Sequence, residues 1–273
     1  GRTIEAWMKV ENLNIGVPYY KLAVDPADRP EVIHITQGNF YLGFHYEKSY
    51  AQIIKPIIDP QSVFGPVTDF SYPRRFLAER NFKPPKNETV ESKTPAAFTL
   101  IAFRLKAREE KTFYALAGHS RSIGALNASV GKITACGYLP KKKEENKEII
   151  EELQNGIATC SSSVEFNLYA KQTYLDNILR GGFPLAFNSN SQNCIFYLYS
   201  RKHGDMERDY NKFLLQPTYF SQGNGNYRDT NQNRRSDVWF NPDIGDENLI
   251  YFFNLIQTDG FNPLVVKGSS FRL

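Results

Sequence analysis

The pattern of the 273-residue sequence changes once, near residue 139, and this change limits the fold more than any other feature. Before it, apolar residues come in short runs rich in β-branched and aromatic side chains, and turn residues separate the runs. After it, charged and apolar residues recur at helical spacing. The sequence therefore predicts a mixed fold in which β structure comes first and helices follow.

The β prediction rests on four runs, at residues 32–36, 39–46, 97–105 and 112–118. The charged segment 106–111 between the last two has the character of a hairpin connection. Residues 53–86 hold six prolines, which central strands exclude, so we expect an ordered excursion from a sheet there. These features favour an antiparallel β-sandwich over residues 1–125.

Three amphipathic or apolar stretches predict helices at 141–155, 163–180 and 246–258. Gly156 can end the first helix, which we place in a helical linker over residues 126–162. Gly181 and Gly182 stop the second. Asp246 is a plausible N-cap of the third and Gly260 can end it. Because the third helix is apolar nearly all round, we expect it to be buried between other helices.

The apolar run 193–200 predicts a strand or a buried extended piece in the C-terminal part, residues 163–273. Aromatic side chains make up 14% of the chain. This richness suits a protein that stacks on flat or ring-shaped ligands, and it equally suits aromatic-rich β structure. Both interpretations stay open.

Net charge is +4, from 33 basic and 29 acidic residues, and it is spread along the chain. The basic triplet 141–143 is followed at once by two glutamates, which is typical of a solvated helix and not of a nucleic-acid surface. Cys136, Cys160 and Cys194 are far apart and form no zinc-binding pattern. Their odd number and the absence of a signal peptide favour a reducing, cytoplasmic location. No apolar run is long enough to cross a bilayer. We therefore expect no metal, nucleic-acid or membrane partner.

The polar stretch 222–235 is the strongest candidate for a functional site. Gly223 and Gly225 free its backbone, and its amide side chains both donate and accept hydrogen bonds. Arg228 and Asp229 stand side by side in it. A carboxylate beside an arginine stays ionised and can accept two sugar hydroxyls, while the guanidinium donates in a planar fork. The alternative is an Arg–Asp pair that pins a loop.

Two other interpretations of this stretch are excluded by spacing. A dinucleotide fingerprint needs a third glycine where Arg228 stands. A calcium loop beginning at Asp229 needs a glycine where Arg234 stands and a glutamate where Phe240 stands.

Residues 201–210 hold seven ionisable side chains before Tyr210. Such a run is either a solvated loop or an ion-paired loop whose arginines orient other polar groups. No Ser/His/Asp or Cys/His arrangement emerges. Two carboxylates for glycosidic chemistry could come from Asp205, Asp209, Asp229 and Asp237, and the sequence does not choose among them.

Three segments resemble the inverting β-glucan phosphorylases of the cellobiose phosphorylase type. Residues 165–182 are similar to the first helix of their barrel, and residues 199–211 to the loop that follows. The third segment, similar to their sugar-site motif, is Tyr227-Arg228-Asp229-Thr230-Asn231-Gln232. The longer form, 216–235, most resembles the β-1,3-glucan (laminarin-type) oligosaccharide phosphorylases.

This resemblance implies part of a β-sandwich, a helical linker and the first helices of an (α/α)6 barrel. It implies cleavage of β-1,3-glucan oligosaccharides by inorganic phosphate, with inversion and release of α-glucose 1-phosphate. No cofactor is implied besides phosphate as co-substrate. In relatives the general-acid aspartate lies downstream of the motif, so we expect no catalytic residue in this chain, which we interpret as a fragment of a longer polypeptide. A homodimer is a further expectation from relatives.

The site residues implied by the resemblance fall into three groups. Those expected to bind the sugar are Arg228, Asp229, Tyr227, Asn226, Gln232 and Asn231. Gly223 and Gly225 would shape the loop, and Arg201, His203 and Asp205 would give polar support. The alternatives are a non-catalytic carbohydrate-binding or scaffold protein, and a phosphorylase for a β-1,4 or β-1,2 linkage.

Overall fold

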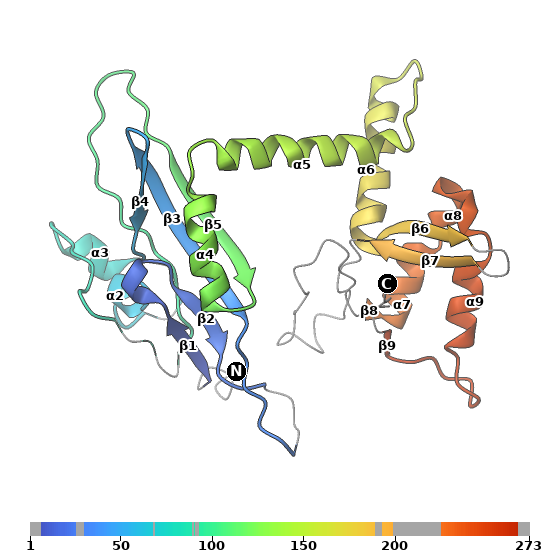
Figure 1. The fold of residues 1–273 in the computed structure, drawn as a ribbon, viewed down its shortest axis with the longest axis horizontal. Coiled ribbons are helices and arrows are strands. Elements are labelled where there is room, and N and C mark those ends of the chain that lie inside the picture. The colour runs from blue at the N-terminus through green and yellow to red at the C-terminus, as the bar shows by residue number, and fades with distance from the viewer. Residues whose placement is uncertain are drawn as a thin grey trace. The chain divides into compact units, whose positions relative to one another are not determined.

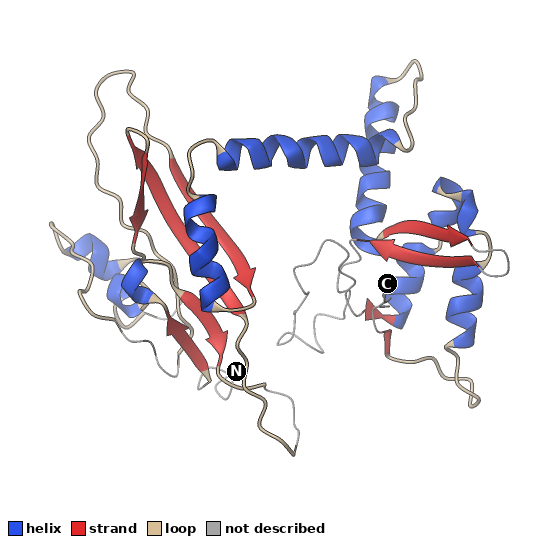
Figure 2. Ribbon diagram, in the orientation of Figure 1, coloured by secondary structure: helices blue, strands red, loops and turns tan. Residues whose placement is uncertain are grey.

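The computed structural model describes residues 7–25, 30–67, 69–88, 90, 93–188, 193–198 and 225–266. The chain divides into two compact units, residues 1–142 and 143–273. The division into segments 1–125, 126–162 and 163–273 stays a prediction. Figure 2 shows strands concentrated in the first unit and helices in the second, which confirms the predicted order of β structure followed by helices.

One curled antiparallel sheet of five strands forms the first unit (Figure 1). Its strands are β1 (Met8–Glu11), β2 (Tyr19–Leu22), β3 (Gly38–Glu47), β4 (Tyr50–Ile54) and β5 (Phe113–Ser120). β3 pairs with β5 along one edge. On its other edge it pairs first with β2 and then with β4. The predicted runs 39–46 and 112–118 are thus the two longest strands, and the described residues contain no second sheet packed on this one.

Alternation along β3 divides its side chains between two covered faces. On one face, Leu42 and Phe44 pack with Leu126 and Val130 of α4 (Ile123–Ile133). On the other face, the Tyr41 hydroxyl bonds the Thr99 hydroxyl at 2.7 Å. The segment around Thr99 therefore lies over the sheet instead of joining it.

Two predicted strands are wrong. Within 97–105, only Phe98 forms a bridge, to Ile57, and Thr99 lies over the face of the sheet. Within 32–36, only His34 forms a bridge, to Val24. β-branched and aromatic composition alone did not distinguish a strand from an extended covering segment.

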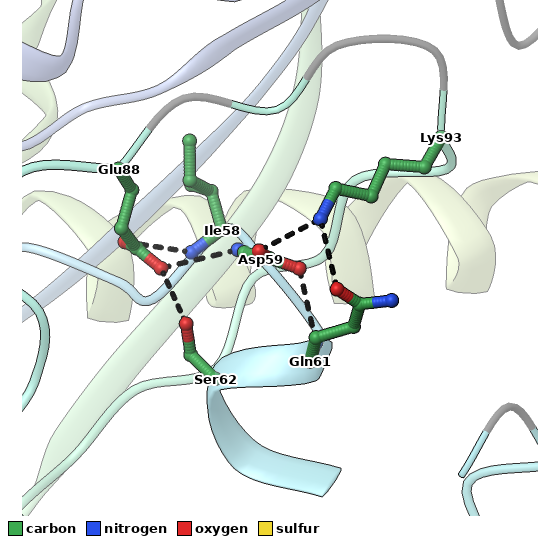
Figure 3. Close-up of polar contacts among 6 residues, drawn as sticks. All are labelled: Ile58, Asp59, Gln61, Ser62, Glu88 and Lys93. Carbon is green, nitrogen blue, oxygen red and sulfur yellow. Dashed lines mark hydrogen bonds and ion pairs between the residues drawn. The ribbon is translucent and has the colours of Figure 1, made fainter. Parts of the chain in front are cut away.

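The proline-rich excursion follows β4, as predicted, and contains two short helices, α2 (Gln61–Phe64) and α3 (Arg74–Ala78). The Glu88 carboxylate stabilises the first residues of the excursion. It accepts hydrogen bonds from the backbone N–H groups of Ile58 and Asp59, at 3.1 and 3.2 Å (Figure 3). Lys93 binds the Asp59 carboxylate at 2.8 Å. These side-chain contacts order a stretch that contributes no β-strand among the described residues. A short 3₁₀ helix, η1 (Leu13–Ile15), connects β1 to β2.

Helix α5 (Tyr138–Asn155) spans the boundary between the units, and none of its residues is buried. It matches the predicted charged helix, and Gly156 follows its last residue. Helix α6 (Val164–Gly181) also matches its prediction. The Ser163 hydroxyl caps α6 by accepting a hydrogen bond from the Phe166 N–H at 3.2 Å.

The rest of the second unit is a hairpin followed by short helices. Strands β6 (Phe183–Asn188) and β7 (Asn193–Leu198) pair in the hairpin, and β7 confirms the predicted extended run. Strands β8 (Gly225–Asn226) and β9 (Val265–Val266) form a second pair. The helical elements between them are α7 (Tyr227–Arg234), α8 (Asp237–Phe240), η2 (Pro242–Ile244) and α9 (Glu247–Asn254).

The third predicted helix differs most from expectation. Asp246 lies at the N-cap of α9, but the helix ends at Asn254, four residues before the predicted end. Phe252 is buried against Tyr227 and Val266. Leu249 and Phe253, by contrast, are 63% and 68% exposed. The prediction that this helix is buried all round is therefore wrong, because only one of its faces finds packing partners among the described residues. These helices do not close into a barrel.

Candidate functional site

Within the polar stretch 222–235, the described residues 225–235 are mostly helical. Gly225 and Asn226 form β8, and residues 227–234 form α7. The Asn226 side chain starts the helix, because its Oδ1 accepts a hydrogen bond from the Arg228 N–H at 3.0 Å. Asp229 lies in the first turn, where the helix dipole favours a negative charge. The described part of the stretch is therefore regular secondary structure, and its role as a sugar site stays a prediction.

Arg228 and Asp229 form an ion pair, with 3.0 Å between Arg228 Nε and Asp229 Oδ1. The Arg228 side chain is 75% exposed and the Asp229 side chain 25%. Both residues belong to α7, and within the described residues the pair links that helix to no other element. The pair therefore leaves most of the Arg228 side chain and a smaller part of the Asp229 side chain exposed near the start of a helix.

Tyr227 is a core residue. Its side chain is 8% exposed and packs edge-on against the Phe252 ring, with 5.5 Å between ring centroids. Its hydroxyl donates to the Phe252 carbonyl oxygen at 2.9 Å. Tyr227 thus anchors α7 to α9, and its hydroxyl is occupied by the protein.

The remaining sugar-site residues separate along α7. The Asn226 oxygen serves the helix cap, while Asn231 and Gln232 are exposed. The structure thus brings Arg228 and Asp229 together at the start of the helix and places Asn231 one turn further on. Gly223, Arg201, His203, Asp205 and Asp209 lie outside the described residues.

A pocket of about 280 Å³ lies beside this helix, between α7 and α9. Its polar wall is formed by Asn231, Arg234, Arg235 and Asn248. Its apolar wall includes Tyr227, Phe252 and Leu249. The volume is slightly below the roughly 300–1,000 Å³ of ordinary small-molecule sites. The combination of an apolar wall with a few converging polar groups is typical of such sites.

Arg234 connects the pocket to a buried polar cluster that sequence reasoning missed. Its Nε donates to the Gly181 carbonyl oxygen at 3.1 Å, and its guanidinium carbon lies 3.7 Å from the centre of the Tyr197 ring. The Tyr197 hydroxyl in turn donates to Asn248 Oδ1 at 2.9 Å. Burial lowers the pKa of Arg234 and raises that of Tyr197. The guanidinium thus connects α7 to α6 and β7, and the Tyr197 hydroxyl extends the cluster to α9.

Asp237 is the other charged member of this cluster and is only 2% exposed. Its Oδ1 accepts a hydrogen bond from Asn177 Nδ2 at 2.7 Å, whereas its Oδ2 has no hydrogen-bond partner among the described residues. Burial raises the Asp237 pKa to about 6, although the Asn177 hydrogen bond and the charge of Arg234 act in the opposite direction. A carboxyl with this pKa exchanges its proton close to neutral pH, but its burial keeps it from direct contact with a ligand.

The cluster gives little signal in the sequence. Asp237 appeared only among four candidate carboxylates, and Arg234 only as a residue that rules out a calcium loop. Asn177 and Asp237 are 60 positions apart, and nothing in their local patterns links them. A charged residue in the first turn of a short helix, such as Asp237 in α8, is an equally common surface feature.

Comparison with protein-family models and with curated proteins gives no match to either. No helix in the described ranges has both the length and the apolar character that a membrane span requires. Within the same ranges, no three His, Cys, Asp or Glu side chains group closely enough to hold a metal ion.

Proposed function

We propose that the chain is part of a β-glucan phosphorylase that binds β-1,3-glucan oligosaccharides through α7. The whole enzyme would cleave them with inorganic phosphate, with inversion and release of α-glucose 1-phosphate. The observation that carries the proposal is the Arg228–Asp229 ion pair at the open start of α7. It stands inside the segment 227–232, which resembles the sugar-site motif of these enzymes.

The geometry of the pair suits sugar hydroxyls. Asp229 pairs with Arg228 in the first turn of α7, and its carboxylate oxygens can accept hydroxyl hydrogens. The exposed part of the Arg228 guanidinium can donate to a third oxygen of the same ring. Asn231 supplies an exposed amide one turn away and also lines the neighbouring pocket.

In this proposal the five-stranded sheet belongs to a β-sandwich, and helices α6 to α9 begin an (α/α)6 barrel. Further segments of the same polypeptide supply the rest of both. Inversion requires one carboxylic acid to protonate the leaving oxygen while phosphate attacks from the opposite face. Asp237 is buried too deeply for that contact, so the proposal assigns no general acid to the described residues.

Isothermal titration calorimetry with laminaritetraose tests the binding step. Asp229→Asn keeps the side-chain volume but removes the charge, so we expect at least tenfold weaker binding because the charge-assisted hydrogen bonds are lost. Glu151→Gln is the matched control, since Glu151 also forms an exposed ion pair, with Lys147 on α5. Equal affinities for wild type and Asp229→Asn would refute the assignment of the site.

A second candidate function, a non-catalytic carbohydrate-binding or scaffold protein, uses the same exposed pair. It needs only the exposed ion pair and no acid carboxyl beside it. The two functions differ in one product. Release of glucose 1-phosphate from laminaritetraose and phosphate by the polypeptide that carries this chain supports the phosphorylase, whereas binding without release supports the second function.

A further inference from the structure

The Arg234 guanidinium is held rigidly but is incompletely hydrogen-bonded. Its Nε bond to Gly181 and its stacking on Tyr197 fix the plane of the group. The remaining guanidinium nitrogens, Nη1 and Nη2, have no hydrogen-bond partner among the described residues. Arginine has five donors in a planar fork and stays protonated, so a partly buried guanidinium with unused donors favours an acceptor beside it.

No protein carboxylate fills that role in the described part of the chain. The ion pairs formed there do not include Arg234. Asp237 acts on Arg234 through space, but its one hydrogen bond goes to Asn177. The two terminal nitrogens are not among the buried polar atoms without a partner, so they remain accessible and can donate to an oxyanion in the pocket.

The pocket that Arg234 lines offers room for such an oxyanion. Arg235 adds a second positive charge to the same wall, and Asn231 and Asn248 add amide groups. Tyr227 and Phe252 belong to the apolar part of the lining, together with Leu249 and Phe253. A bare inorganic anion would leave this apolar wall in contact with water. The pocket therefore matches a ligand with two ends, one anionic and one apolar.

We propose that the pocket between α7 and α9 binds a small organic oxyanion, a carboxylate or phosphate monoester on an apolar ring. Arg234 binds the oxyanion in a bidentate manner, and Tyr227 and Phe252 contact the ring. This site is separate from the proposed sugar contact, because it depends on Arg234 and not on the Arg228–Asp229 pair. A negative result for the phosphorylase assignment would therefore leave this proposal unchanged.

Phenyl phosphate, benzoate and inorganic phosphate are the probes, titrated into the full chain by calorimetry and by amide NMR. We expect phenyl phosphate or benzoate to bind at least fivefold more tightly than inorganic phosphate, because only they fill the apolar wall. The larger NMR shifts should fall on α7 and α9. The better of the two ring probes identifies the anionic group. Equal affinity for inorganic phosphate, or shifts centred on the lysines of α5, would overturn the proposal.

Two variants locate the contact. Arg234→Gln should weaken binding of the better probe at least tenfold, whereas Lys143→Gln, which removes a positive charge elsewhere, should change the affinity less than twofold.

Because Arg234 also supports the fold, Leu249→Trp provides a second test of the site. Leu249 lines the pocket but is 63% exposed, so a larger side chain there fills the pocket while the core stays intact. Undiminished probe binding by folded Leu249→Trp would contradict the site, as would an unchanged affinity in folded Arg234→Gln. Asp229→Asn should leave probe binding unaffected.

Discussion

At the scale of single residues, the burial of Asp237 links folding to pH. The folded-state pKa is about 6, above the value of 3.8 for an unperturbed aspartate. The folded protein therefore holds this proton more tightly than the unfolded chain does. Between about pH 4 and pH 6 the folded state binds more protons, so the contribution of Asp237 to stability falls as pH rises through that range. Above it, the ionised carboxylate costs the folded state about 3 kcal/mol.

Asp237→Asn removes the titrating group but keeps an oxygen that can accept from Asn177. We expect the free energy of unfolding at pH 7.5 to rise by about 1–2 kcal/mol, since part of the relief is offset by a newly buried amide N–H. At pH 4, where the wild-type carboxyl is largely protonated in the folded state, little relief remains to offset the buried amide N–H, so the variant should be less stable than wild type by about 1 kcal/mol. Urea unfolding at both pH values measures this. A variant less stable than wild type at pH 7.5 would show that the ionised carboxylate is satisfied in the folded protein.

Residue-level prediction from the sequence succeeded where the partners are neighbours. Arg228 and Asp229 could be paired because they are adjacent in the chain. The contacts of Arg234 with Gly181 and of Asp237 with Asn177 join residues more than 50 positions apart. Such pairs depend on how helices α6 and α7 pack, and one sequence carries no local trace of that packing.

At the scale of elements, β3 is the strand on which the first unit is built, since it pairs with three others. Gly38 begins it at a point where the backbones come close. A Cβ on Gly38 would lie 2.5 Å from the Tyr20 carbonyl oxygen and 2.9 Å from the Tyr19 ring. Any side chain at this position must therefore force β2 and β3 apart.

Gly38→Ala should lower the free energy of unfolding by about 2–4 kcal/mol, because backbone cannot yield as a flexible side chain can. Gly131→Ala in α4 is the matched control. A Cβ there meets nothing within 4 Å, and alanine favours the helix, so we expect a gain of about 0.5–1 kcal/mol. Thermal and urea unfolding of the two variants should therefore move in opposite directions. A neutral Gly38→Ala would mean that the strands are not held this close.

Element prediction worked best where the ends carry local chemical signals. Ser163 caps α6, and Gly156 follows α5, as their side-chain chemistry indicates. It failed for 97–105, whose apolar pattern serves to cover a sheet face, and for α9, whose apolar residues are only partly covered. In both cases the local pattern indicates that the side chains pack on an apolar surface. It does not indicate which part of the protein provides that surface.

At the scale of the whole molecule, the apolar clusters of the described residues each stay within one unit. The clusters around Phe44 and around Ile57 belong to the first unit, and the cluster around Tyr227 belongs to the second. The helix that spans the boundary, α5, buries none of its residues. Each unit therefore has apolar clusters of its own that can support a separate cooperative unfolding step.

We expect the units to open independently in hydrogen–deuterium exchange. Gly38→Ala should speed exchange in β2, β3 and β5 while leaving α7 and α9 unchanged. Ile178 in α6 is only 1% exposed, so Ile178→Ala leaves a cavity in the second unit. This variant should speed exchange in α7 and α9 while leaving β2, β3 and β5 unchanged. Mass spectrometry of peptic fragments resolves both sets of peptides. If either variant speeds exchange throughout the chain, the two units fold as one cooperative body.

The distribution of tryptophan has a practical consequence for such experiments. The chain has two tryptophans, and each unit holds one: Trp7 beside β1 and Trp239 in α8. Trp7 is partly covered, whereas the Trp239 ring is 83% exposed. Iodide will therefore quench Trp239 emission preferentially, and the fluorescence that remains reports on the sheet. Without any added label, the protein carries a separate optical signal for each of its two units.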